Sequence, residues 1–326
     1  MISLLDFFAD LSNPVLAFLP RALLIAMLSA LVCAVVGAHV VLRGMAFIGD
    51  AVAHAVFPGI AIAYVMGFSL VAGGAVAGGT IAVLVAVLAQ NRKIREETLI
   101  GILFAAAFAL GLVIISRAQG YTASLTSFLF GSITGVSEGD ILLVASLGSV
   151  IVATVLILNK ELVAVSLDRE MARALGLPVF WLDLVLYIAV TGAVVISVRT
   201  IGNILVLALL VTPAATARLL TDRLATMMVL SAVFGCIGSF FGIYLSWALD
   251  VPTGATIVLA VTAMFAVAWG GAEAKKSRAV AGCRRRSVKK KSPRQGSNLR
   301  QTDYESAALT DWATGGSRSS LYATSA

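Results

Sequence analysis

The sequence predicts an all-α, polytopic bundle of about eight or nine transmembrane helices, with a short cytoplasmic helix between two of them. Three observations lead to this fold class. Hydrophobic residues make up 60% of the 326 residues and charged residues only 13%, which is more apolar surface than a soluble domain of this length buries. Nine apolar runs are long enough to cross about 30 Å of hydrocarbon. The basic residues also cluster between particular runs.

The nine runs are separated by short polar or glycine-containing segments. They cover residues 15–42, 45–68, 70–89, 99–116, 141–158, 179–198, 201–217, 224–249 and 255–271. The first 20 residues contain Asp6 and Asp10 and lack the basic start of a signal peptide, so we interpret them as a lead-in to the first span. Glycine and alanine are frequent in the runs, as in AGGAVAGG at 72–79, and small residues let helices approach closely in lipid.

The distribution of basic residues predicts the orientation of the bundle. With nine spans, most basic segments fall on one side, which the positive-inside rule assigns to the cytoplasm. These segments are Arg43, the cluster at 92–95, the loop 160–173, Arg218, Arg223 and the tail. Arg117 and Arg199 fall on the other side, so eight or ten spans stay open as alternatives. The polar stretch 120–140 is expected to be an external loop or a re-entrant segment.

The last 54 residues differ from the rest of the chain. Residues 1–272 hold 12 basic and 13 acidic side chains, whereas residues 273–326 hold 12 and 4. We therefore predict a transmembrane domain, 1–272, and a basic, disordered cytoplasmic tail, 273–326. Its cluster at 284–291 is interpreted either as a contact with anionic membrane lipid or as a stop-transfer flank, not as a nucleic-acid site. A readthrough extension is a second interpretation of residues after Ser292.

Asp50 and His54 are the only ionisable side chains in the second run, residues 45–68. Ionisable groups are costly in lipid, and they usually face a bundle interior or a wet cavity on an ion path. Residues four apart on a helix lie on one face, so both side chains can reach one ion. Carboxylate and imidazole together suit manganese, zinc or iron(II), whereas copper(I) prefers sulfur ligands. The alternative is a buried Asp–His hydrogen bond that holds two helices together.

Proline and glycine residues surround this pair. Pro58 lacks an N–H group and its ring strikes the carbonyl four residues earlier, which belongs to His54. We expect a helix kink there, of the kind that transporters use at substrate sites, and Gly49 and Gly59 ease such bending. Pro213 is interpreted in the same way as a packing kink or a second point of flexing. His39, near the end of the first span, is expected to be a packing histidine.

The loop 160–178 contains a predicted short helix. In SLDREMARALGLP, Ser166 or Asp168 is the N-cap, Gly176 lies at the C-cap position and Pro178 stops the helix. The helix is too short to span a membrane, and its charged and small residues suit contact with a soluble partner. No GxxxxGK[ST] motif occurs in the sequence, so the chain has no phosphate cradle of a P-loop ATPase. If ATP drives this protein, another chain hydrolyses it.

Three segments resemble a known family. They are VLRGMAFIGDAVAHAVFPGIAIAY at 41–64, RTIGNILVLALLVTPAATARLL at 199–220 and DREMARALGLP at 168–178. Together they resemble the membrane-spanning permease subunit of bacterial ABC importers for manganese, zinc or iron, and the resemblance covers about residues 15–271. The HAxxPG element resembles the manganese or iron branch more than the zinc branch. The family normally ends soon after its last span, so the tail departs from its pattern.

The resemblance implies roles for particular residues and partners. Asp50 and His54 would bind the transported ion, and the coupling helix, including Asp168, Glu170, Ala172 and Gly176, would contact the ATPase. The implied partners are a second permease copy, a cytoplasmic ABC ATPase dimer that binds ATP, and an extracytoplasmic metal-binding protein. The permease would lie in the bacterial plasma membrane and would bind no cofactor of its own. A proton-coupled secondary carrier and a non-transporting membrane scaffold are the rival interpretations.

Overall fold

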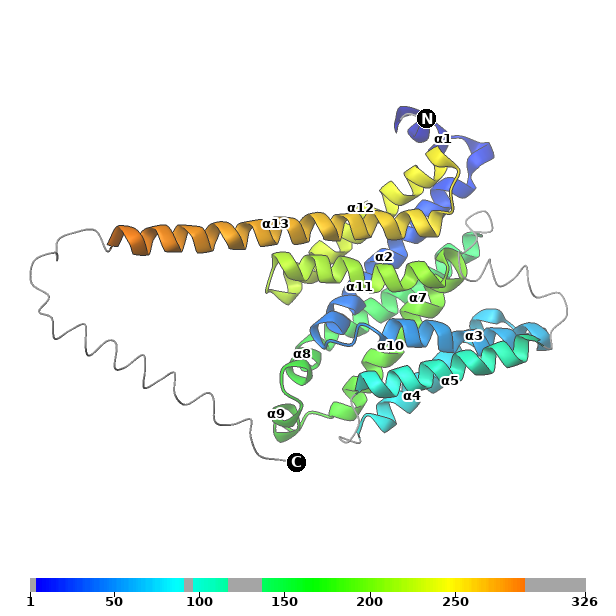
Figure 1. Cartoon of the computed structure of the whole chain (residues 1–326). Coiled ribbons are helices and arrows are strands. Elements are labelled where there is room, and N and C mark those ends of the chain that lie inside the picture. Colours follow the sequence, from blue (N-terminus) through cyan, green and yellow to red (C-terminus); the bar gives the residue numbers. More distant parts are fainter. Residues whose placement is uncertain (1–3, 91–95, 117–136, 291–326) are drawn as a thin grey trace, which may run out of the picture. The chain divides into compact units, whose positions relative to one another are not determined.

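The computed structural model describes residues 4–90, 96–116 and 137–290, and nearly all of these residues are helical (Figure 1). The helices are α1 (Leu4–Leu11), the 3₁₀ helix η1 (Pro14–Leu16), α2 (Phe18–Leu42), α3 (Ile48–Met66), α4 (Leu70–Leu88), α5 (Glu96–Ser116), α7 (Glu138–Ile157), α8 (Asn159–Leu167), α9 (Arg169–Ala174), α10 (Val179–Ile201), α11 (Asn203–Leu220), α12 (Leu224–Leu249) and α13 (Thr253–Lys290). The chain divides into two compact units, Met1–Ala272 and Glu273–Ala326.

Each of the nine predicted apolar runs coincides with a helix. Within the described residues, seven helices are long and apolar enough to cross a membrane. Two further apolar helices are shorter, Ala51–Ala63 within α3 and Leu205–Leu220 within α11. The predicted fold class, an all-α polytopic membrane bundle with a short helix, α9, in the loop 160–178, is therefore confirmed.

Helices α2 and α10 form the centre of the first unit. Helix α2 packs against α7, α10, α11 and α12, while α10 also contacts α3 and α4. Their spans are 67% buried, more than the other long spans among the described residues. A helix that is apolar on all sides suits this position, because every face contacts either another helix or lipid.

Small residues lie where helices meet most closely, as the sequence predicted. A Cβ atom at Gly235 of α12 would lie 3.1 Å from Ala30 of α2, and one at Gly242 would lie 2.4 Å from Ile257 of α13. Lipid tails are as apolar as leucine, so packing of helix surfaces, more than exclusion of water, stabilises such contacts. Glycine permits this packing by removing the side chain from the interface.

The lead-in before the first span is a helix that packs on the bundle. The Phe7 side chain of α1 is fully buried, and its ring lies edge to face with Phe240 and Tyr244 of α12 at 5.9 and 5.4 Å. The Trp247 indole donates a hydrogen bond of 2.9 Å to the Asp10 carboxylate. Asp10 thus has a polar partner on α12, while Phe7 joins the core.

Several segments that the positive-inside rule placed in the cytoplasm meet at one end of the bundle. Arg43, after α2, donates to Ser166 of α8 at 3.0 Å, and Arg173 of α9 donates to Gln90, after α4, at 3.4 Å. The starts of α2 and α7, which should lie on the outer side, are joined by an ion pair between Arg21 and Glu138 at 2.7 Å. The structure therefore groups the helix ends as the predicted orientation requires.

Two predicted segments differ from the structure or lie outside it. Helix α13 continues past residue 271 and ends at Lys290, so the expected loss of helical structure does not begin at residue 274. Alanine and lysine are strong helix formers, which favours this extension. Disorder of residues 291–326 stays a prediction, since they lie outside the described residues. The same holds for a loop at 120–136, whereas Ser137 and Asp140 form a capping box that begins α7.

Candidate metal site and coupling helix

Helix α3 begins inside the bundle. After α2 the chain turns at Gly44 with φ of 71°, and the Met45 N–H donates to the Val40 carbonyl at 3.1 Å, so α2 ends in a Schellman turn. A Cβ at Gly49 would lie 2.7 Å from the Leu210 side chain, in the middle of α11. The first turn of α3, which includes the backbone of Asp50, therefore lies beside the middle of a membrane helix.

His54 lies one turn further along α3. The side chain of Asp50 is outside the described residues, whereas His54 is partly buried. Its imidazole lies edge to face with two rings of α5, Phe104 at 4.9 Å and Phe108 at 5.1 Å between ring centroids. These aromatic contacts orient the imidazole. They also mean that His54 has a packing role that the sequence did not reveal.

The arrangement limits what kind of metal site α3 can form. Among the described residues, no three His, Cys, Asp or Glu side chains come together as a ligand group. The Asp50 side chain is outside these described residues. If Asp50 and His54 bind an ion, they would supply two ligands from one helix face, and water or other oxygen atoms would complete the shell. Such a site suits weak, reversible binding of a manganese or iron(II) ion more than a permanent structural site.

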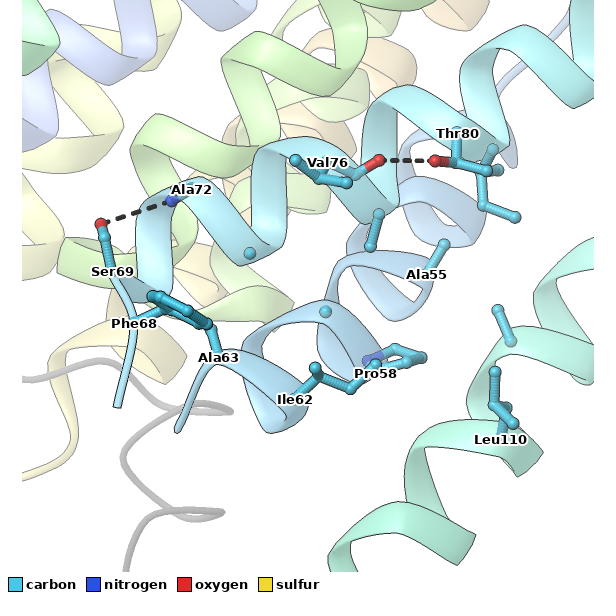
Figure 2. A pocket seen from close by; sticks show the side chains of 15 residues that line it. Ala55, Pro58, Ile62, Ala63, Phe68, Ser69, Ala72, Val76, Thr80 and Leu110 are labelled. Carbon is cyan, nitrogen blue, oxygen red and sulfur yellow. Dashed lines mark hydrogen bonds between the residues drawn. The ribbon is translucent and has the colours of Figure 1, made fainter. Parts of the chain in front are cut away.

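A cavity of about 620 Å³ lies beside Pro58, between α3, α4 and α5 (Figure 2). Its fifteen lining residues include no His, Asp or Glu. The two hydroxyl groups in its wall are already used, since Ser69 caps α4 by accepting from the Ala72 N–H and Thr80 donates to the Val76 carbonyl. The cavity is therefore an apolar hollow in the helix packing and carries no metal ligands.

The other singled-out residues of the apolar runs are buried in helices. Helix α3 continues through Pro58 and α11 continues through Pro213, and both prolines are buried. Near Pro213, a Cβ at Gly37 of α2 would lie 1.9 Å from the Leu210 carbonyl oxygen, so α2 and α11 touch through their backbones there. His39 is fully buried in α2, and its interpretation as a packing residue stays a prediction.

The short cytoplasmic helix has the predicted caps. Asp168 is the N-cap of α9, and its carboxylate accepts hydrogen bonds from the N–H groups of Glu170 and Met171 at 2.8 and 3.0 Å. Gly176 has φ of 78°, and its N–H donates to Arg173 while the Leu177 N–H donates to Ala172. These two bonds form a Schellman turn. Asp168 and Gly176 therefore fix where α9 begins and ends, whichever residues contact a partner.

One residue of the predicted partner contact faces the other way. Ala172 is 1% exposed and belongs to the core cluster of the bundle, so its side chain is not offered to a partner. Most other residues of this region are exposed, among them Glu170 and three large apolar side chains, Leu167, Met171 and Leu175. Met171 lies in α9 and Leu175 is its C-cap, one turn further on, whereas Leu167 ends α8 just before the extended N-cap Asp168. The short helix thus buries an alanine, while large apolar side chains are exposed on it and at its two ends.

One acidic residue in a predicted span has a role that was not predicted from the sequence. Asp183 lies in α10, is 1% exposed, and forms ion pairs with Arg43 at 2.6 Å and with Arg169. The sequence did contain a signal for this residue. An acidic side chain inside an apolar run usually has a partner inside the bundle, which is the same reasoning that singled out Asp50.

A polytopic helical bundle with no P-loop and with a capped cytoplasmic helix is the architecture of a membrane permease that works with a separate ATPase. The model of the ABC 3 transport family matches residues 15–270. The chain belongs to the ABC 3 transport family. It is a multi-pass membrane subunit of an ABC transporter and not its ATPase.

Relatives and a solved structure support the same assignment. The chain is 40% identical over 253 residues to the manganese transport system membrane protein MntC of Halalkalibacterium halodurans, which covers 78% of this chain and 87% of the relative. It is 35% identical to the chelated iron transport system membrane protein YfeC of Yersinia pestis, over 76% of this chain and 84% of that one. The structure of PsaBC from Streptococcus pneumoniae in complex with Fab matches with a TM-score of 0.73 at 32% identity, over 82% and 95% of the two chains.

Proposed function

We propose that this chain is the permease through which an ABC importer carries divalent manganese, or iron(II), into the cell. The metal is inferred from the relatives, since a manganese permease is 40% identical and a chelated-iron permease 35% identical. Membership of an ABC transporter family favours ATP-driven import over the proton-coupled carrier and the scaffold. Zinc stays a third candidate because the same ligand types bind it.

In this proposal the ion passes along the face of α3 that carries Asp50 and His54. The observation that supports it most directly is the position of this turn, beside the middle of α11, where Gly49 contacts Leu210. A carboxylate in such a place is costly unless a cation or a polar partner offsets the cost. Two ligands from the chain leave the ion weakly held, so that it can move on.

The proposed partners follow from the same mechanism. An extracytoplasmic protein delivers the metal to a pair of permease chains, and a cytoplasmic ABC ATPase dimer binds to the α9 region of each. ATP binding moves α9 and changes which side of the membrane the ion site faces. The exposed apolar side chains of Leu167, Met171 and Leu175 are the proposed contact, because such side chains at a cytoplasmic end suit a protein interface.

Uptake of radioactive manganese into vesicles that contain the permease and its ATPase tests the function. We expect uptake that requires ATP and the partner ATPase, with unlabelled manganese or iron(II) competing more strongly than zinc. Asp50→Ala and His54→Ala should each abolish uptake while the ATPase still co-purifies. Uptake driven by a pH gradient without ATP would instead support the secondary carrier, and normal uptake by Asp50→Ala would remove the proposed ion site.

A further inference from the structure

A buried carboxylate joins three elements at the cytoplasmic end of the bundle. Asp183, in the second turn of α10, is 1% exposed and lies between two guanidinium groups. Arg43, at the end of α2, contacts one carboxylate oxygen at 2.6 Å, and Arg169, the first residue of α9, contacts the other. Removing Arg43 would leave the buried carboxylate with only the partly exposed Arg169 as a partner, which is strongly unfavourable.

Arg43 holds α8 as well as α10. Its Nε donates to the Ser166 hydroxyl at 3.0 Å, and its Nη2 approaches the Leu162 carbonyl at 3.5 Å. Ser166 in turn donates to the same carbonyl at 2.6 Å. The Arg43 side chain is 7% exposed, so water cannot readily replace these partners. A displacement of α8 therefore acts on Arg43 directly, whereas a displacement of α9 reaches it through Asp183.

Arg43 is also joined firmly to α3. Only residues 44–47 separate it from the first residue of α3, Ile48. This connection is an ordered turn, since Gly44 donates to Val41 and Ile48 donates to Met45 at 3.1 Å each. Met45 is itself buried against Tyr187 of α10. A shift of Arg43 should therefore also displace the first turn of α3, which includes Asp50, because the turn between them is short and ordered.

A small cavity lies beside the ion pairs, next to Arg169. It is polar, has a volume of about 130 Å³ and is lined by Arg43, Val165, Ser166, Leu167 and Arg169. Arg169 is partly exposed, with 34% of its side chain accessible. The Arg43–Asp183 pair is therefore fixed in the bundle, whereas the Arg169 contact is the one that can lengthen or shorten as α9 moves.

We propose that Asp183 is a positioning residue that links the cytoplasmic helix α9, through Arg169 and Arg43, to the first turn of α3. The proposal rests on the proposed function, in which an ATPase moves α9 and α3 carries the ion. Asp183 touches neither the ATP nor the metal. Its role is to convert displacement of α9 into displacement of α3, so that ATP hydrolysis and metal movement stay linked.

The test compares the number of metal ions imported per ATP hydrolysed, measured on the reconstituted complex of permease and ATPase. Arg169→Gln removes the outer ion pair and leaves the buried Arg43–Asp183 pair intact, so the bundle should still fold. Asp183→Asn is the second variant. Glu138→Gln is the control, since it breaks an exposed ion pair, 2.7 Å to Arg21, at the opposite end of the bundle.

We expect Arg169→Gln to co-purify with the ATPase and to hydrolyse ATP at close to the original rate, whereas Asp183→Asn should also lower the melting temperature because it leaves the buried Arg43 without its counter-charge. Manganese imported per ATP should fall by about fivefold or more, the range of a coupling between two sites, and Arg169→Lys should recover most of the loss. The Glu138→Gln control should be unchanged.

Three results would overturn the link. They are an unchanged ratio in Arg169→Gln, a parallel fall of hydrolysis and uptake that leaves the ratio unchanged, and release of the ATPase by the variant, which would make Arg169 a docking residue. Failure of the proposed function would look different, because the original protein itself would then show no ATP-dependent uptake.

Discussion

Gly59 of α3 and Gly73 of α4 meet backbone to backbone. A Cβ atom at Gly59 would lie 2.2 Å from the Gly73 carbonyl oxygen, and one at Gly73 would lie 2.5 Å from the Gly59 carbonyl oxygen. A Cβ atom at Gly78, further along α4, would lie 2.6 Å from the Thr191 side chain of α10. The glycines of α4 therefore place α3 at a fixed distance from α4, and with it the helix that carries Asp50 and His54.

The Gly59–Gly73 contact should not tolerate a larger side chain. Gly73→Val should lower the free energy of unfolding of the detergent-solubilised protein by about 1–3 kcal/mol, the cost of an overpacked contact, and so lower its melting temperature. The cost arises because backbone atoms cannot move aside as side chains do. Gly79→Val is the control, since no atom lies within 4 Å of a Cβ at Gly79. Equal melting temperatures for the two variants, measured by intrinsic fluorescence, would contradict the close approach.

His54 has two candidate roles, ligand and packing residue, that one pair of substitutions separates. His54→Phe keeps an aromatic ring against Phe104 and Phe108 but removes the ring nitrogens, so uptake of manganese should be lost while the melting temperature is kept. Phe108→Leu removes an edge-to-face contact and keeps the imidazole, so it should lower stability by about 0.5–1.5 kcal/mol and leave most of the uptake. If His54→Phe transports normally, the residue only packs.

Gly176 should be needed for transport through the shape of α9. At φ of 78° a β-branched residue is strained, by roughly 1–2 kcal/mol, so Gly176→Val should disturb the Schellman turn and weaken ATPase-dependent uptake while metal binding to the permease persists. Gly101→Val in α5 is the matched control, because a Cβ there also meets no atom within 4 Å and the backbone is helical. Loss of metal binding in Gly176→Val would argue against a purely cytoplasmic effect.

The exposed apolar side chains in and beside α9 should bind the ATPase. Met171→Ser should weaken association of the ATPase by about tenfold, the effect of losing roughly 1.4 kcal/mol of apolar contact, as measured by titrating the ATPase onto immobilised permease. Met66→Ser is the control, since Met66 is 62% exposed compared with 60% for Met171 but lies at the far end of α3. A similar loss in both variants would point to a general effect on the bundle.

The features that the sequence could predict are those with local causes. The nine apolar runs predicted the long helices, because the thickness of the hydrocarbon and the helical rise set the length of a membrane-spanning helix. The caps of α9 were also predictable, since Asp168 and Gly176 act on backbone groups within three or four residues of themselves. The end of the last helix was misplaced because residues 274–290 have high helix propensity but no apolar pattern to reveal it.

The sequence by itself determined that this chain is a membrane bundle with an Asp–His pair one turn apart in its second span and a capped helix in its cytoplasmic loop. Only the tertiary structure decided that Asp183 pairs with Arg43, which is 140 residues away, that His54 packs on Phe104 and Phe108, and that Ala172 faces the core while Met171 does not. Hydrophobicity and caps are properties of short segments, whereas the partner of a buried charge depends on which helices lie next to each other.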